Sequence, residues 1–200
     1  MHRSIASVIL LASLAACSSS QPAVPRIDFI PRDISLTPSA DNANLQTFRA
    51  AGLEIQRFAK AMVLTTELRV QLDDHKRSQE LPAEMKSNLE QFIGLPRALD
   101  DSASTLVVHS AITGARPDNP LVDLGTHQPS RGDGGYTAVE VFATDGMKGP
   151  VVAAMTYTII SHKLTLGSNA AWARTETALQ EAAEAFAKLL KPGLTFPQDR

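Results

Sequence analysis

Cys17 is the one cysteine of this 200-residue chain, and its thiol is the most reactive group that the sequence offers. It follows Leu14-Ala15-Ala16 and precedes three serines. A thiol pairs in a disulfide, binds a metal or carries a covalent modification, and one cysteine alone forms no internal disulfide. A modification is therefore the chemistry that this residue favours.

The residues before Cys17 have the order of an export signal. Residues 1–3 form a short positive head, and residues 4–13 form an apolar run of about ten residues, too short to span a bilayer. Leader and cysteine together resemble the lipobox of bacterial lipoproteins, whose cysteine is acylated and becomes the new N-terminus. By that resemblance Cys17 carries a lipid anchor, and Ser18, where an Asp would favour retention in the inner membrane, favours the outer membrane. The alternative is an ordinary signal peptide, with Cys17 incidental.

The other side chains do not form a catalytic or metal-binding pattern. None of the four histidines after the leader has a second ligand at metal-site spacing; they are His75, His109, His127 and His162. The sequence contains no Gly-x-Ser-x-Gly elbow and no phosphate-binding or dinucleotide glycine pattern. The adhesion tripeptide Arg131-Gly132-Asp133 is typical of chance in a glycine-rich turn. We expect no catalytic residue, no metal and no cofactor.

Two features are candidates for binding a partner. Glu140 is a carboxylate in the middle of an expected strand, on the face opposite Val139 and Val141. It is either a solvated or arginine-paired side chain on an open sheet face, or a polar contact in a partner interface.

The second candidate is the stretch 114–135, which is longer than most connections and contains three prolines and five glycines. Its apolar residues Leu121, Val122 and Leu124 are the candidate contacts. The alternative is a connection without a binding role.

Composition limits the class of partner. The chain has 19 basic and 21 acidic residues, and removal of residues 1–16, which carry one arginine and no acid, leaves a net charge near −3. A chain without basic clusters is not expected to bind nucleic acid. A hydrophobic content of 44% suits one globular domain.

Hydrophobic periodicity predicts four strands and two helices. Strands are expected over 61–72, 104–113, 136–144 and 151–160, the last two forming a hairpin, with 73–79 as a solvated turn. The first helix is expected from Pro82 at its first position to Gly94. The second is expected over 170–191, capped by Ser168 or Asn169, with Trp172 and Phe186 as its main core anchors.

These elements predict an α+β fold of two layers, a mixed four-stranded sheet with two helices packed on one face. We divide the chain into a signal peptide (1–16), a lipidated N-terminus and flexible tether (17–44), one α+β domain (45–192) and a C-terminal tail (193–200). Within the proline-rich tether, Ile27, Phe29 and Ile30 are able to dock on the domain.

Three stretches point to a family. Ala111-Ile112-Thr113, Val139-Glu140 followed by Asp145-Gly146, and a closing helix with an early Trp172 are similar to the bacterial lipoproteins grouped as domain of unknown function 3313. The likeness covers about residues 53–190 and departs from the family at the turn 147–149. The resemblance implies the same fold and the same location in the cell envelope, and it implies no activity.

From these observations we expect a non-enzymatic lipoprotein of the outer membrane, with its domain in the periplasm or at the cell surface. Its partners would be the membrane, through the lipid, and an envelope protein. The alternative function is a periplasmic hydrolase or other enzyme with an unrecognised site.

Overall fold

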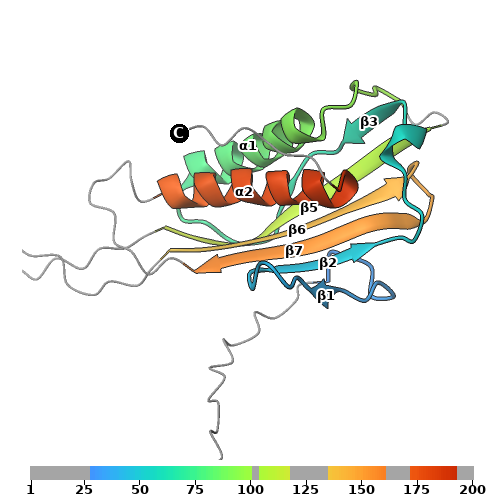
Figure 1. The fold of residues 1–200 in the computed structure, drawn as a ribbon. Coiled ribbons are helices and arrows are strands. Elements are labelled where there is room, and N and C mark those ends of the chain that lie inside the picture. Colours follow the sequence, from blue (N-terminus) through green and yellow to red (C-terminus); the bar gives the residue numbers. More distant parts are fainter. Residues whose placement is uncertain (1–27, 101–103, 118–134, 161–171, 193–200) are drawn as a thin grey trace, which may run out of the picture.

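Seven strands in the described part of the chain form one mixed sheet, and two helices lie side by side on one of its faces (Figure 1). The computed structural model describes residues 28–100, 104–117, 135–160 and 172–192. The strands are β1 (Thr37–Pro38), β2 (Leu45–Arg49), β3 (Lys60–Val63), β4 (Glu67–Leu68), β5 (Thr105–Arg116), β6 (Tyr136–Asp145) and β7 (Val151–Ile160). Their order is β1-β2-β7-β6-β5-β3, and β4 also pairs with β5.

The fold class and the position of the helices are confirmed, but the number of strands is wrong. The single strand expected over 61–72 is divided into β3 and β4, and each pairs in parallel with β5. Between them the chain is anchored by Thr66, whose buried Oγ1 lies 2.8 Å from Oγ of Ser110. β1 and β2 were not expected, because they lie at or before the start of the predicted domain.

The three long antiparallel strands form the centre of the sheet. β6 and β7 agree with their predicted ranges, and Val139, Val141 and Ala143 face the core as expected. β5 continues three residues beyond its predicted end, through a register shift at Gly114. A Cβ on Gly114 would lie 2.2 Å from Cε1 of Tyr136, so glycine at this position leaves room for the ring of Tyr136.

Helix α1 (His75–Ile93) begins seven residues before the predicted start. Asp74 is its N-cap, and the carboxylate accepts a hydrogen bond of 3.1 Å from the backbone N–H of Arg77. The stretch expected to be a solvated turn is therefore the first turns of the helix, and Pro82 lies inside it. Gly94, with φ 61°, ends the helix as predicted.

Helix α2 (Ala173–Leu190) buries its apolar stripe between α1 and the sheet. Phe186 is fully buried, as expected, whereas Trp172 is half-buried at the N-terminal end of the helix. An ion pair of 2.5 Å between Arg77 and Glu176 joins the starts of the two helices. The predicted caps Ser168 and Asn169 lie outside the described residues. Neither described helix is long and apolar enough to cross a membrane.

The described chain joins the sheet earlier than residue 45. Residues 28–36, which we call the strap, lie on the face of the sheet away from the helices, and β1 follows directly (Figure 1). Ile30 has 1% of its surface exposed. The docking of Phe29 and Ile30 foreseen from the sequence is therefore present, while Ile27 lies outside the described residues.

Candidate functional site

The face of the sheet opposite the helices, here called the open face, carries the candidate carboxylate Glu140. Side chains of β5, β6 and β7 alternate between the two faces, so the residues out of phase with the core project here. Several small residues lie on this face, among them Ala111, Ala138 and Ala154. His109, Glu140 and Phe142 project from the same face.

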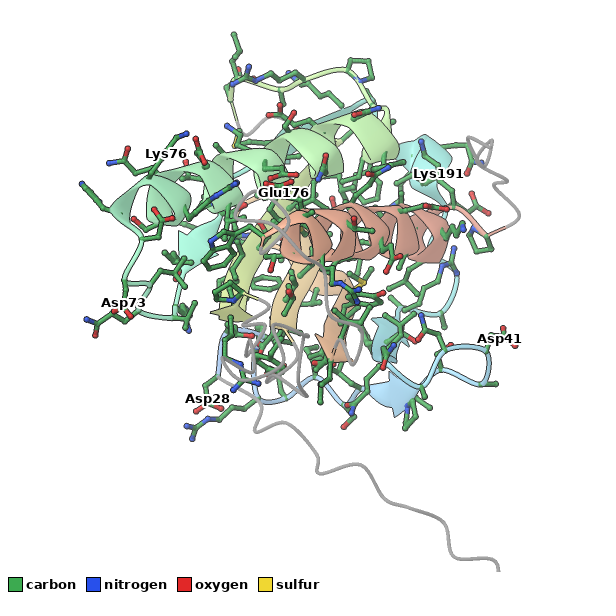
Figure 2. All side chains as sticks on the ribbon, turned by 90° about the vertical axis from the view of Figure 1, so that its left-hand side faces the viewer. Asp28, Asp41, Asp73, Lys76, Glu176 and Lys191 are labelled. Atoms are coloured by element: carbon green, nitrogen blue, oxygen red, sulfur yellow. The ribbon has the colours of Figure 1, made fainter. Side chains whose placement is uncertain are left out.

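The strap crosses the open face from one edge of the sheet to the other. At its start, the backbone carbonyl of Asp28 accepts a hydrogen bond of 3.3 Å from Arg69, just beyond β4. Two residues later Ile30 lies over β6, and after the end of the strap Thr37 pairs with Thr47 of β2. Figure 2 accordingly shows Asp28 and Asp41 on opposite sides of the molecule, below the helices.

Glu140 is buried beneath the strap, with 3% of its surface exposed. It lies in the middle of β6, opposite Ala111 of β5 and Thr156 of β7. Its Oε2 accepts a hydrogen bond of 3.2 Å from the backbone N–H of Ile30. The carboxylate is therefore not solvated, because this face of the sheet is covered here. Its predicted place on the face opposite Val139 and Val141 is correct.

An aromatic column stands beside Glu140. The ring of Phe29 in the strap lies 5.3 Å from that of Phe142, which stacks in turn on His109 at 4.4 Å and 6°. Above Phe29, the guanidinium of Arg69 lies 4.8 Å from the ring centre, a cation–π distance. Glu67 holds this guanidinium through a 2.9 Å contact between Oε2 and Nε. The strap is thus held by a cation, an aromatic ring and a carboxylate.

Burial gives His109 an unusual environment. It lowers the pKa of the imidazole below its ordinary value, and the negative charge of Glu67 opposes this effect. Nε2 of His109 is buried and has no hydrogen-bond partner among the described residues. A neutral imidazole stacked on Phe142 is an aromatic packing group here.

The sequence did not reveal this cluster as a unit. Phe142 follows Glu140 by two residues and so shares its face, and the pairing of His109 with Phe142 depends on the register of β5 against β6. Arg69 and Phe29 come from segments remote from both. The one indication within a single stretch of sequence was that Glu140 and Phe142 are two residues apart in an expected strand and so project from the same face.

The other predicted site residues are not brought to this face by any described contact. Cys17, Leu121, Val122 and Leu124 lie outside the described residues, as do His127 and His162. His75 is exposed at the start of α1. Of the predicted insert, residues 114–116 belong to β5.

The described residues offer little for catalysis or ligand binding in a cavity. No group of three His, Cys, Asp or Glu side chains within them is arranged to hold a metal. A hollow beside α1 and β3 holds about 130 Å³ and is lined by Ala61, Val63, Glu90, Ile93, Leu95 and Arg97. Small-molecule sites usually hold about 300–1,000 Å³.

Comparisons with known proteins do not assign this chain to a family. No family model and no curated protein sequence matches the chain. Among solved structures, the PelC dodecamer from Paraburkholderia phytofirmans is 17% identical, with a TM-score of 0.45 over 74% of this chain and 94% of that one. A minor lipoprotein from Acinetobacter baumannii is 12% identical, with a TM-score of 0.36 over 65% and 91%.

A third structure is a Xanthomonas campestris protein of domain of unknown function 330. It is 10% identical, with a TM-score of 0.43 over 64% of this chain and 81% of that one. At these values the likeness assigns this chain neither an activity nor a partner. The resemblance to domain of unknown function 3313 stays a prediction.

Proposed function

We propose that this protein is a non-enzymatic lipoprotein, anchored in the outer membrane through Cys17, that binds an envelope protein. The leader and Cys17 support the anchor, and Ser18 supports the outer membrane over the inner one. The resemblance to lipoproteins of domain of unknown function 3313 agrees with this address. Neither a metal nor a cofactor is part of the proposal.

The observation that carries the proposal is the strap. The segment that would lead to the lipid does not leave the domain at residue 45 but crosses the open face and buries Glu140 and Ile30. Ten residues, 18–27, remain between Cys17 and the strap. Fully extended they reach at most about 36 Å. Anchor and candidate binding face are thereby parts of one continuous unit.

An enzyme is the second candidate, and the geometry favours it less. Catalysis needs converging groups with matched acid–base roles. His109, the histidine that lies on the open face, stacks on Phe142, and Glu140 accepts a backbone N–H. These contacts serve packing and binding. A carboxylate, histidine and serine in mutual hydrogen-bond reach within a pocket would support the hydrolase instead.

The anchor and the partner are tested together by crosslinking in cells. The wild-type protein is expected in the membrane fraction with a captured envelope protein, and Cys17→Ser is expected to lose the membrane fraction. Capture of no protein by the wild type, under conditions that crosslink a known envelope complex, would contradict the binding role. Retention of Cys17→Ser in the membrane would contradict the anchor.

The insert is tested in the same assay. Replacement of residues 120–129 by a short Gly-Ser linker is expected to leave folding and membrane localisation intact but to reduce capture of the partner. The reason is that Leu121, Val122 and Leu124 would be lost from a loop carried by the rigid strands β5 and β6. Capture of the partner at full yield by the shortened protein would mean that the insert only connects β5 and β6 and has no binding role.

A further inference from the structure

We infer that the open face contains a peptide-binding groove that the strap fills in cis, and that its partner ligand is a protein segment in which an aromatic residue is followed by an aliphatic one within a turn. The groove is formed by Arg69, His109, Glu140 and Phe142. This inference deepens the proposed binding function and rests on it. It concerns a different surface from the insert and is tested on purified protein rather than in cells. A negative result for the groove is therefore distinguishable from a negative result for the proposed function.

The contacts of the strap define what the groove recognises. Glu140 accepts a backbone N–H, which any residue except proline can offer. The ring of Phe29 lies between the ring of Phe142, with 5.3 Å between the ring centres, and the guanidinium of Arg69, 4.8 Å from the ring centre. We call the place of this ring the aromatic seat. Next to it lies the side chain of Ile30, which has 1% of its surface exposed. We call its place the aliphatic seat. Residues 28–30 form a turn rather than an extended strand, and the turn lets the consecutive side chains Phe29 and Ile30 both reach the sheet. A main-chain contact gives affinity in such recognition, and the side-chain pockets give specificity.

The strap can be replaced without dismantling the sheet. Residues 28–36 belong to no strand, and sheet pairing begins at Thr37. β2 remains paired with β7 through five residues, whatever occupies the groove. The groove itself stands on β4, β5 and β6 and their flanks. A partner segment with the same two side chains therefore fits the same seats.

Covalent attachment makes the strap a competitor rather than a permanent cover. A segment tied close to its site acts at an effective concentration in the millimolar range. A second copy of the chain offers the same segment at a far lower concentration, so exchange between copies is not favoured. A partner segment must bind more tightly than the strap, or must be held close by another contact with the domain.

The test uses the chain from residue 17 with Cys17→Ser, and a labelled peptide with the sequence of residues 26–34. The chain with its strap intact is expected not to bind the peptide measurably. The variant Phe29→Ser/Ile30→Ser, which empties both seats, is expected to bind it. A control peptide with alanine in place of Phe29 and Ile30 is expected to bind at least about tenfold more weakly.

Addition of Phe142→Ala to the opened variant provides the matched control in the protein. It removes the floor of the aromatic seat and is expected to weaken peptide binding about tenfold or more. Absence of binding to a folded opened variant would overturn the inference. Equal binding of the alanine peptide, or no effect of Phe142→Ala, would do the same.

A second route covers the case in which the opened variant does not fold. A protease site placed in the exposed β1–β2 turn at Ala40 and Asp41 lets the chain fold before it is cut. Excess labelled peptide is then expected to replace the N-terminal fragment while the far-ultraviolet circular dichroism stays unchanged. A fragment that never exchanges, or a domain that unfolds when the fragment leaves, would show that the strap is a fixed part of the core.

Discussion

Glu140 and Phe142 lie two residues apart on β6, so both project from the open face. A carboxylate buried without a partner would be costly, and Glu140 is stabilised by the N–H of Ile30. Phe142 joins the ring of the strap to the ring of His109. Two neighbouring positions on one strand thus hold a segment that is 110 residues away in sequence.

At this scale His109 predicts a dependence of stability on pH. Burial lowers its pKa in the folded protein below 6.5, the value expected when the chain unfolds. Between the two pKa values the unfolded chain binds more protons, so the free energy of unfolding should fall as the pH falls through about 6.5. Urea unfolding of the wild type between pH 7.5 and pH 5 measures this fall.

His109→Gln, which does not titrate, is the reference for this measurement. The decrease in the free energy of unfolding between pH 7.5 and pH 5 should be smaller in His109→Gln than in the wild type. Equal decreases in both proteins would mean that the neutral imidazole contributes nothing to the pH dependence.

Among the elements, α1 shows a proline where helices rarely have one. Pro82 is the eighth residue of α1 and has no N–H to donate to the carbonyl of Ser78, one turn before it. The helix persists because Asp74 caps its start and Leu81, Met85, Leu89 and Ile93 bury one continuous stripe. Tertiary packing therefore outweighs the local cost.

Pro82→Ala is expected to raise the free energy of unfolding by about 1–2 kcal/mol. Alanine restores the missing hydrogen bond in the helix, and the greater freedom of the unfolded chain offsets part of the gain. Thermal and urea unfolding measure the change. Pro96→Ala, at an exposed position after the helix, should lower stability slightly. A loss of stability in Pro82→Ala would mean that the greater freedom of the unfolded chain outweighs the restored hydrogen bond.

The two expected anchors of α2 should differ in importance. Phe186 is fully buried, so Phe186→Ala should lower the free energy of unfolding by about 3–5 kcal/mol. Trp172 is half-buried at the start of the helix, and Trp172→Ala should cost about 1–2 kcal/mol. Urea unfolding of both variants gives the comparison. A larger loss from Trp172→Ala would mean that the end of the helix supports the packing more than its middle.

The number of residues that link the domain to the proposed lipid anchor at Cys17 depends on whether the strap is docked. With the strap docked, residues 18–27 reach at most about 36 Å; with the strap released, residues 18–36 reach at most about 68 Å. The covalent anchor is the same in both states. Occupation of the groove by a partner would therefore also increase the distance that the domain can reach from the membrane.

Energy transfer from Trp172, the one tryptophan of the chain, to labelled lipids tests this coupling. Lipidated wild-type protein in vesicles is expected to show more transfer than lipidated Phe29→Ser/Ile30→Ser, because the docked strap keeps the domain nearer the bilayer. Cys17→Ser protein provides the background. Equal energy transfer in the lipidated wild type and in the opened variant would mean that docking of the strap does not change the distance of the domain from the bilayer.

The sequence by itself determined the features that repeat over several residues. Strand alternation over β6 and β7 and the apolar stripe of α2 identified these elements and the faces that they bury. They also determined the α+β class and the placement of Glu140 opposite Val139 and Val141. Each of these signals is local, because a strand or helix of about ten residues or more shows its own period.

Tertiary structure alone decided the parts whose stability comes from remote partners. β1 and β4 have two residues each, too few to show a period, and they exist because β2 and β5 pair with them. α1 continues through Pro82 because its buried stripe outweighs a local signal. The strap has no periodic pattern, and the burial of Ile30 and Glu140 follows from contact across 110 residues, which no single stretch of sequence contains.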